Sequence, residues 1–472
     1  MGSNKVAFFD GDREIPYERF SRDITAAQGF LKREFPEGCE LLGLAASMGP
    51  YLHWVLHAAC SIERITTLAM RPNQGIYNDI VVAGPIDLNH LGPSLVFDHK
   101  VLAELRATLP EQDNPGFDLF LEALRTGEDT VNRIVLTSGS TGISKAVPLT
   151  CKSVMGRFAV AERLHKLSAE HKMLTTLGRD TVGGYYFPIE CFMVGATVLN
   201  LRRGGQDREQ FAAMFRASTL FYSVPAIVQG MLTLISEPVQ GAETRVMATM
   251  GSRLEPETAD KCRALLAADV SSIYGSTEVG WVTRASEETV VADPSNTGKV
   301  YDEAVVEIVD AEGQLVPAGD DGIIRIHTPW MSPGYWDDGL VQPFEGGWFY
   351  PGDTGRLTPD GDLLVSGRTD DRLNYNGEKF DAVGLESQLK ALAGIDDAFV
   401  AVVNIAARDR MVVMACSSLD PESLRTTLAS VVSRVPFDLL PAARIPRNHM
   451  GKIERKRLSE YCRQILMQTL EQ

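Results

Sequence analysis

The chain has 472 residues, which is too long for one ordinary hydrophobic core and predicts two to four folding units. Hydrophobic residues make up 44% and charged residues 23%, a composition that argues against disorder as the state of any large section. The formal net charge of −16 disfavours a nucleic-acid partner, because an acidic surface repels a phosphate backbone.

Cysteine usage and hydropathy indicate the compartment. The seven cysteines are scattered, odd in number and without a Cys-x-x-Cys pair, which argues against a disulfide framework or a structural zinc site. The N-terminus lacks a signal-peptide pattern. The most apolar long stretch, 41–60, is broken by Gly43, Pro50, His53 and His57, so it predicts a buried strand and a helix. We expect a cytoplasmic protein without a membrane span.

The first half of the chain alternates helical and strand-like patterns. Apolar residues at helical spacing predict helices over Tyr17–Phe35, His53–Ile62 and Leu149–Lys166. Short apolar runs predict strands over Glu40–Ser47, Val131–Leu136, Ala196–Leu201, Leu220–Val224 and Arg245–Thr249. Such alternation predicts a layered α/β architecture.

From Ala304 the pattern becomes rich in short strands, such as Val305–Asp310 and Gly322–His327, separated by Gly, Asp and Pro turns. A boundary is expected near 367–371. Beyond it the pattern predicts helices over Ala382–Leu392 and Pro421–Val435 and strands over Ala398–Asn404 and Arg410–Cys416. That tail of about 100 residues is large enough for its own α+β core.

One segment of the sequence carries phosphate chemistry. Residues 137–145 read Thr-Ser-Gly-Ser-Thr-Gly-Ile-Ser-Lys and follow an apolar run directly. Glycines let the backbone direct several N–H groups toward one anion, hydroxyls add donors, and Lys145 adds charge. A Walker A loop would need Gly where Ser144 stands, and the Gly-x-Ser-x-Gly order of a nucleophile elbow is absent.

This segment resembles the phosphate-binding loop of the adenylate-forming superfamily, which includes acyl-CoA synthetases, aryl-acid ligases, luciferases and the adenylation domains of peptide synthetases. The resemblance implies that Lys145 is catalytic and that the loop binds ATP through Thr137, Ser138, Gly139, Ser140, Thr141 and Gly142.

Four further segments resemble the family, in the family's order. In Tyr274-Gly275-Ser276-Thr277-Glu278, the resemblance implies that Tyr274 stacks on adenine beside Gly275, that Thr277 reaches the α-phosphate, and that Glu278 holds Mg²⁺ together with Thr141. Met250-Gly251-Ser252 corresponds to the adenine-side loop. The resemblance of 348–353 implies that Asp353 binds the ribose hydroxyls, and that of 367–371 implies that Arg368 contacts the nucleotide.

The C-terminal part completes the resemblance, which extends from about Val6 to Leu458. Pro446–Arg455 resembles the Pro-Arg-x-x-x-Gly-Lys-x-x-Arg segment, so Lys452 is implied to bridge the attacking carboxylate and the α-phosphate. Asp370 corresponds to the family's hinge residue before the C-terminal domain. Gly377 corresponds to the glycine that, in thioester-forming members, lies along the tunnel through which the thiol enters. Ser144 and Ala146 stand where the family usually has Pro and Gly. We expect these two differences to leave Lys145 in place.

The implied fold is α/β. It consists of a large, multi-layered N-terminal AMP-binding domain over 1–368, with a β-rich subdomain at about 296–368, and a small mobile C-terminal α+β domain over 369–472 that carries Lys452. The implied reaction joins a carboxylic acid to the AMP part of ATP and then transfers the acyl group to a thiol. ATP, Mg²⁺, a small carboxylic acid, and CoA or the phosphopantetheine of a separate carrier protein are the implied cofactors and partners.

The acid site is the most divergent part. Leu177–Thr197 corresponds to the segment that lines it, and Asp180 stands where many relatives carry His or an aromatic residue. We expect Asp180, Gly183, Gly251 and Gly280 to contact the acid, with Asp180 receiving a cationic or hydroxylated group. A helix cap or a loop acid is the alternative role for Asp180. Tyr185, Tyr186, Phe187 and Trp281 could wall an aromatic pocket or simply fill the core.

Three alternatives remain open at this stage. The acyl acceptor could be an amine, or the substrate could be an amino acid. A catalytically silent nucleotide-binding homologue is a third alternative, against which the intact Lys145, Glu278, Asp353, Arg368 and Lys452 argue.

Overall fold

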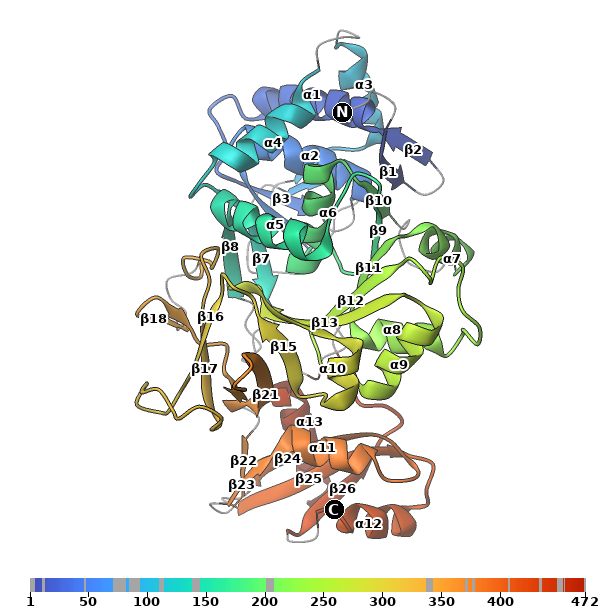
Figure 1. The fold of residues 1–472 in the computed structure, drawn as a ribbon, viewed down its shortest axis with the longest axis vertical. Coiled ribbons are helices and arrows are strands. Elements are labelled where there is room, and N and C mark those ends of the chain that lie inside the picture. The colour runs from blue at the N-terminus through green and yellow to red at the C-terminus, as the bar shows by residue number, and fades with distance from the viewer. Residues whose placement is uncertain are drawn as a thin grey trace.

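The computed structural model describes residues 5–10, 13–45, 48–70, 82–84, 94–109, 114–137, 145–200, 208–336, 343–369, 372–375, 378–405, 408–432, 435–447, 453 and 455–470. In Figure 1 the N-terminal helices lie at one end of the long axis, the C-terminal sheet lies at the other, and the largest sheet lies between them.

A six-stranded sheet forms the N-terminal layer. Its strand order is β6 (Ser94–Val96), β5 (Val82–Gly84), β3 (Leu41–Ala45), β4 (Thr66–Met70), β7 (Val131–Thr137) and β8 (Lys145–Thr150). All neighbours are parallel except β8, which runs antiparallel to β7. The helices of this region are α1 (Tyr17–Glu34), α2 (Pro50–Ile62), α3 (His99–Ala107), α4 (Gly116–Thr126) and α5 (Cys151–His165). Helix α2 is buried almost all round, which explains its nearly continuous apolar sequence.

Within the described residues, the largest sheet has fifteen strands. One half of it consists mainly of parallel strands, and the other half, which we call the β-rich half, consists of antiparallel strands. The parallel half contains β9 (Lys172–Thr175), β10 (Thr197–Asn200), β11 (Leu220–Ser223), β12 (Val246–Met250) and β13 (Asp269–Ser276), with β1 (Val6–Asp10) and β2 (Arg13–Pro16) at its edge. Its helices are α6 (Val182–Val194), α7 (Arg208–Ala217), α8 (Pro225–Leu232), α9 (Pro256–Leu265) and α10 (Glu287–Ala292).

The β-rich half continues from β13 without a break. It contains β14 (Gly280–Ser286), β15 (Asn296–Val300), β16 (Val305–Val309), β17 (Gly322–His327), β18 (Phe344–Glu345), β19 (Trp348–Phe349), β20 (Asp353–Leu357) and β21 (Asp362–Arg368). Antiparallel pairing links β13 to β14, β14 to β15, β15 to β21 and β21 to β20. This chain of pairings brings 353 and 368 to the same sheet as residue 274.

The C-terminal residues build separate sheets with their own core. A hairpin of β22 (Arg372–Tyr375) and β23 (Glu378–Asp381) precedes a three-stranded sheet of β24 (Ile395–Ile405), β25 (Arg408–Ser417) and β26 (Phe437–Pro441). Alternate residues of β24 face opposite sides, so that Val400 packs near α11 (Ala382–Lys390) and α12 (Pro421–Ala429), while Phe399 packs near α13 (Arg455–Leu470). This part lies beyond β21 in Figure 1.

The predicted α/β class is confirmed, with one helix shorter than expected. The helix predicted to reach Val435 ends at Ala429 with Ser430 as its C-cap. The β-branched pair at 431–432 and Pro436 disfavour its continuation, because both restrict the helical conformation. The predicted division at 368/369 remains a prediction. Within the described residues no helix is long and apolar enough to cross a membrane.

Candidate active site

The predicted adenine segment lies where β13 turns into β14. Gly275 belongs to a bulged pair there, and a Cβ on it would lie 2.0 Å from the carbonyl oxygen of Gly280. A side chain at 275 would therefore force the two strands apart. Because β12 and β13 are parallel, with Met250 paired to Ile273, the adjacent Gly251 emerges at the same sheet edge as Tyr274.

Tyr274, Asp353 and Arg368 form one hydrogen-bonded cluster. The Tyr274 hydroxyl donates to Asp353 Oδ2 at 2.5 Å, and Arg368 Nη1 donates to Asp353 Oδ1 at 3.0 Å. Asp353 and Arg368 are paired residues of β20 and β21, which places their side chains together. Burial and the neighbouring Asp353 carboxylate raise the pKa of Tyr274 well above its usual range, so this hydroxyl keeps its proton. Three segments predicted to hold the nucleoside thus converge.

Glu278 and Lys145 both contact Tyr335, Glu278 at the hydroxyl and Lys145 at the ring face. Glu278 is buried, and its Oε1 accepts a hydrogen bond of 3.0 Å from the Tyr335 hydroxyl. The Lys145 ammonium lies 5.0 Å from the centroid of the Tyr335 ring, within cation–π range. The loop lysine and the predicted Mg²⁺ ligand are therefore close neighbours in space.

The phosphate loop is framed by two described residues. Thr137 at the end of β7 pairs with Lys145 at the start of β8, so the loop leaves and re-enters the sheet at one point. Ser138, Gly139, Ser140, Thr141 and Gly142 lie outside the described residues, as do Asp370, Gly377 and Lys452.

Arg157 supports the turn that carries Thr277 and was not identified from the sequence. It lies on α5, is fully buried, and donates through Nη2 to the Thr277 carbonyl at 3.0 Å. Its guanidinium stacks over the Tyr186 ring at 4.4 Å. Gly280, with φ of +75°, lies so close that a Cβ on it would meet Arg157 Nε at 2.7 Å. A single arginine on an amphipathic helix carries no sequence signal for this role.

The adenine-side loop at 250–252 and the acid segment at 177–197 both reach the sheet edge at which β12 and β13 end. Gly251 has φ of +90°, a conformation that favours glycine, and both Gly251 and Ser252 are exposed. At the start of α6, a Cβ on Gly183 would approach Met250 Sδ at 3.5 Å. The predicted acid-contacting glycines therefore lie around the carboxyl ends of β12 and β13.

Asp180 lines a cavity of about 160 Å³ together with His53, Ala69, Gly178 and Arg179. The N-cap of α6 is Thr181, whose hydroxyl accepts from the Gly184 amide at 3.1 Å, so the alternative role of Asp180 as a helix cap is wrong. The helix N-cap and the cavity lining are therefore formed by different residues, Thr181 and Asp180.

The cavity is backed by a buried arginine. Arg133 on β7 is fully buried, and its Nη1 lies 3.4 Å from His53 Nε2. Burial, followed by the Arg133 charge, lowers the pKa of His53 well below its usual range. With Nε2 facing an arginine donor, the neutral ring carries its proton on Nδ1, which has no hydrogen-bond partner. His53, one of the residues that line the cavity, thus carries a buried N–H without a hydrogen-bond partner.

The aromatic residues of α6 are core residues. Phe187 stacks on Tyr222 with centroids 3.7 Å apart and on Trp281 at 5.3 Å. Tyr185 donates its hydroxyl to Asn132 Oδ1. These contacts favour the packing role that the sequence left open for them.

Among the described residues, no group of three His, Cys, Asp or Glu side chains could hold a metal ion by itself. Mg²⁺ in nucleotide enzymes is commonly bound by one or two carboxylates together with substrate phosphates. The buried Glu278 at the turn fits that donor set.

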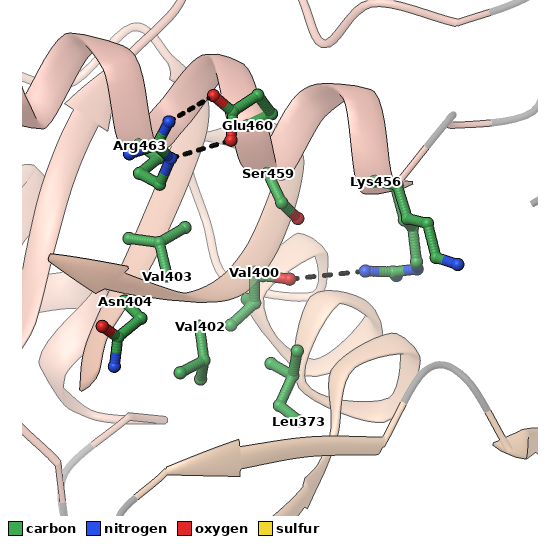
Figure 2. Close-up of a pocket in the computed structure, with 10 residues that line it drawn as sticks. Leu373, Val400, Val402, Val403, Asn404, Lys456, Ser459, Glu460 and Arg463 are labelled. Carbon is green, nitrogen blue, oxygen red and sulfur yellow. Dashed lines mark hydrogen bonds and ion pairs between the residues drawn. The ribbon is translucent and has the colours of Figure 1, made fainter. Parts of the chain in front are cut away.

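A second cavity, of about 310 Å³, lies on the C-terminal part (Figure 2). Two of its three cationic residues are engaged, since Arg455 donates to the Val400 carbonyl and pairs with Glu386 at 2.5 Å, and Arg463 pairs with Glu460 at 2.6 Å, while Lys456 also lines the cavity. None of the predicted nucleotide-binding residues lines it.

Comparison with known proteins agrees with this geometry. The sequence profile described as "AMP-binding enzyme" matches residues 88–336. A salicylyl-CoA synthase / salicylate adenylyltransferase from Streptomyces is 24% identical, with 97% of this chain and 91% of the relative aligned. A salicyl-AMP ligase / salicyl-S-ArCP synthetase from Mycobacterium tuberculosis is 28% identical, with 54% of this chain and 46% of the relative aligned.

Among solved structures, ATP-bound MatB from Rhodopseudomonas palustris has the same fold, with a TM-score of 0.83, 18% identity and coverage of 98% and 97% of the two chains. MenE from Bacillus subtilis in complex with ATP and magnesium gives a TM-score of 0.79 at 16% identity, covering 97% of each chain.

The fold and the converging site define an adenylate-forming enzyme. The chain belongs to the family of AMP-binding enzymes. The prediction of an AMP-forming acid–thiol ligase, which activates a carboxylic acid as an acyl-adenylate, is confirmed.

Proposed function

We propose that this chain is a stand-alone ligase that adenylates a hydroxylated aromatic acid and transfers the acyl group to CoA or to a carrier protein. The observation that carries the proposal is the convergence of Tyr274, Asp353 and Arg368 beside the Lys145–Tyr335–Glu278 group. Two acids, two cations and two tyrosines then surround one nucleotide site.

ATP is bound in this proposal by groups with matching chemistry. Tyr274 lies beside adenine with Gly251 and Ser252, and the two oxygens of Asp353 accept from the ribose hydroxyls. The amides and hydroxyls of Thr137–Gly142 hold the phosphates, and Arg368 is oriented by its ion pair of 3.0 Å with Asp353. Thr277 faces the α-phosphate.

The first step is an in-line substitution. A carboxylate oxygen of the acid attacks the α-phosphorus, the bond to the bridging oxygen breaks, and pyrophosphate leaves. Lys145 and Lys452 stabilise the charge that develops on the phosphate oxygens, and Glu278 with Thr141 would hold Mg²⁺. Bound Mg²⁺ supplies charge neutralisation of the phosphates.

The second step uses the C-terminal part. We propose that residues 369–472 rotate about Asp370, which withdraws Lys452 and admits a thiol past Gly377. The thiolate sulfur attacks the acyl carbon and AMP leaves with the electrons of the broken acyl–phosphate bond. The separate core of β24, β25 and β26 supports a unit that can move as one body.

The substrate class follows from the cavity at Asp180. A phenolic hydroxyl can donate its proton to the Asp180 carboxylate and accept from the unpartnered Nδ1–H of His53. Relatives named for salicylate, 2-hydroxy-7-methoxy-5-methyl-1-naphthoate and hydroxybenzoates support an acid of this class. We expect Gly183, Gly251 and Gly280, which lie around the carboxyl ends of β12 and β13, to contact the acid.

The acceptor and the compartment remain parts of the proposal. Relatives named as CoA ligases and as an acyl-carrier-protein ligase support a thiol of either kind. An amine acceptor and an amino-acid substrate are the competing alternatives, and a silent homologue is disfavoured by the intact site. All seven cysteines are unpaired, which supports a reducing, cytoplasmic compartment.

Pyrophosphate exchange tests the proposal. We expect exchange with salicylate above that with benzoate, aliphatic acids or amino acids, and product formation with CoA or holo-carrier but not with amines. Asp353→Asn should raise the KM for ATP by roughly tenfold or more, because a charge-assisted hydrogen bond is lost. Asp321→Asn, which breaks an exposed pair with Arg356, is the control and should leave the KM unchanged. No exchange with any acid would refute the function.

A further inference from the structure

The segment 328–336 follows β17 and is fastened to the turn that carries Glu278. Thr328 Oγ1 and Trp330 Nε1 donate to the Val279 carbonyl at 3.0 and 2.8 Å. The Ser332 amide donates to the Glu278 carbonyl at 2.7 Å. Backbone and side-chain donors of this one segment therefore hold the turn in place.

The same segment is also fastened to β8, the strand that begins at Lys145. The Trp336 amide donates to the Ala146 carbonyl at 2.8 Å, and Ser332 Oγ lies 3.0 Å from the Pro148 carbonyl. Gly334 has φ of +151°, which lets the backbone direct the next residue into the site. The position of β8 relative to the Glu278 turn is thus set through 328–336.

Tyr335 is the residue of this segment that contacts the charged groups. It is buried, its hydroxyl donates to Glu278 Oε1 at 3.0 Å, and its ring lies 5.0 Å from Lys145 Nζ. The Tyr335 hydroxyl is the donor in this contact, because an ionised carboxylate can only accept. Lys145 and Glu278, which are both described, form no direct ion pair.

We propose that Tyr335 is a positioning residue for adenylation that holds Lys145 and Glu278 apart and orients each toward the triphosphate. Opposite charges in a half-buried site attract each other strongly, and a direct pair would turn both away from the nucleotide. The tyrosine separates them by giving each its own partner, a hydroxyl for the carboxylate and a ring face for the ammonium. The inference rests on the proposed function, which assigns these two groups to ATP and Mg²⁺.

Two variants separate the two contacts of Tyr335. Tyr335→Phe removes the hydroxyl and keeps the ring, whereas Tyr335→Leu removes both. The matched control is Tyr17→Phe, because Tyr17 is also buried and its hydroxyl donates to the Ala196 carbonyl at 2.6 Å, outside the site. Thermal unfolding of all three proteins establishes that they fold. Pyrophosphate exchange is measured against Mg²⁺ and ATP, and the Kd for ATP is measured by calorimetry with Mg²⁺ and with a chelator.

We expect Tyr335→Phe to raise the Mg²⁺ concentration for half-maximal exchange by about tenfold, with kcat restored at saturating Mg²⁺, since one hydrogen bond to a charged group is lost. Its Kd for ATP with chelator should match that of wild type. Tyr335→Leu should also weaken binding of ATP with chelator, because Lys145 loses the ring. If Tyr335→Phe matches Tyr17→Phe in Mg²⁺ dependence while wild type is active, the positioning role is wrong. An inactive wild type that binds no ATP would refute the proposed function instead.

Discussion

Asp180 is the residue proposed to determine which acid is bound. It stands next to the N-cap residue Thr181 without being the cap, and it lines the same cavity as His53. If its carboxylate accepts from a phenol, Asp180→Ala should reduce the preference for salicylate over benzoate by roughly 10- to 100-fold in kcat/KM. Benzoate turnover should change little, because it lacks the hydroxyl.

Thr181→Ala is the matched control for this prediction. It removes the cap bond to the Gly184 amide and should lower the Tm of the protein without changing the ratio between the two acids. Competition between salicylate and benzoate in pyrophosphate exchange measures that ratio directly. An unchanged ratio in Asp180→Ala would remove Asp180 from the acid site.

At single positions, the sequence predicted which residues serve the chemistry better than it predicted which residues contact each other. The resemblance identified Tyr274, Asp353 and Arg368 because each motif carries its own residue types, and the structure joins them through hydrogen bonds. Arg157 and Tyr335 could not be found in this way. Their roles depend on which distant elements lie beside them, and local spacing contains no information on that.

At the scale of one element, α6 contains a buried carboxyl group that makes the stability of the fold decrease as the pH rises. Glu190 is buried, its Oε1 has no partner, and burial raises its pKa to about 8, against the lowering effect of Arg157. In the unfolded chain this carboxyl titrates near 4.5. Between these values the folded state holds one more proton, so the free energy of unfolding falls as the pH rises.

Glu190→Gln removes this titration while keeping the shape of the side chain. We expect the Tm of the variant relative to wild type to increase steadily from pH 5 to pH 8, with a slope that corresponds to at most about 1.4 kcal/mol per pH unit. Glu122→Gln on the exposed face of α4 should show no such trend. Parallel pH profiles for Glu190→Gln and wild type would show that Glu190 titrates normally.

Elements were predictable where their periodicity was strong. The strands at 131–136 and 322–327 and the helix from Tyr17 lie close to their expected bounds. The hairpin of β22 and β23 was missed, because a pair of four-residue strands leaves too little alternation to recognise. The helix at Pro421 was extended too far, because apolar spacing continues through residues whose backbone preferences oppose a helix.

At the scale of the whole molecule, the sequence predicted an α/β layered fold but not its strand order. One continuous sheet joins the parallel half to the β-rich half through β13 and β14, and this connection brings Asp353 to Tyr274. Pairing between strands far apart in the chain depends on packing of complete faces, which periodicity does not encode.

The final prediction concerns the division of labour between the two parts of the chain. If residues 369–472 contribute Lys452 only to the first step, Lys452→Ala should reduce adenylation by about 10²- to 10³-fold, because one charge that stabilises the transition state is lost. Transfer to a thiol from acyl-adenylate supplied in the assay should remain near the wild-type rate. Lys456→Ala, a lysine four positions further along on α13, should leave both steps unchanged. Rapid-quench measurement of each half-reaction decides the matter, since equal loss of both steps in Lys452→Ala would mean that the C-terminal part does not alternate between them.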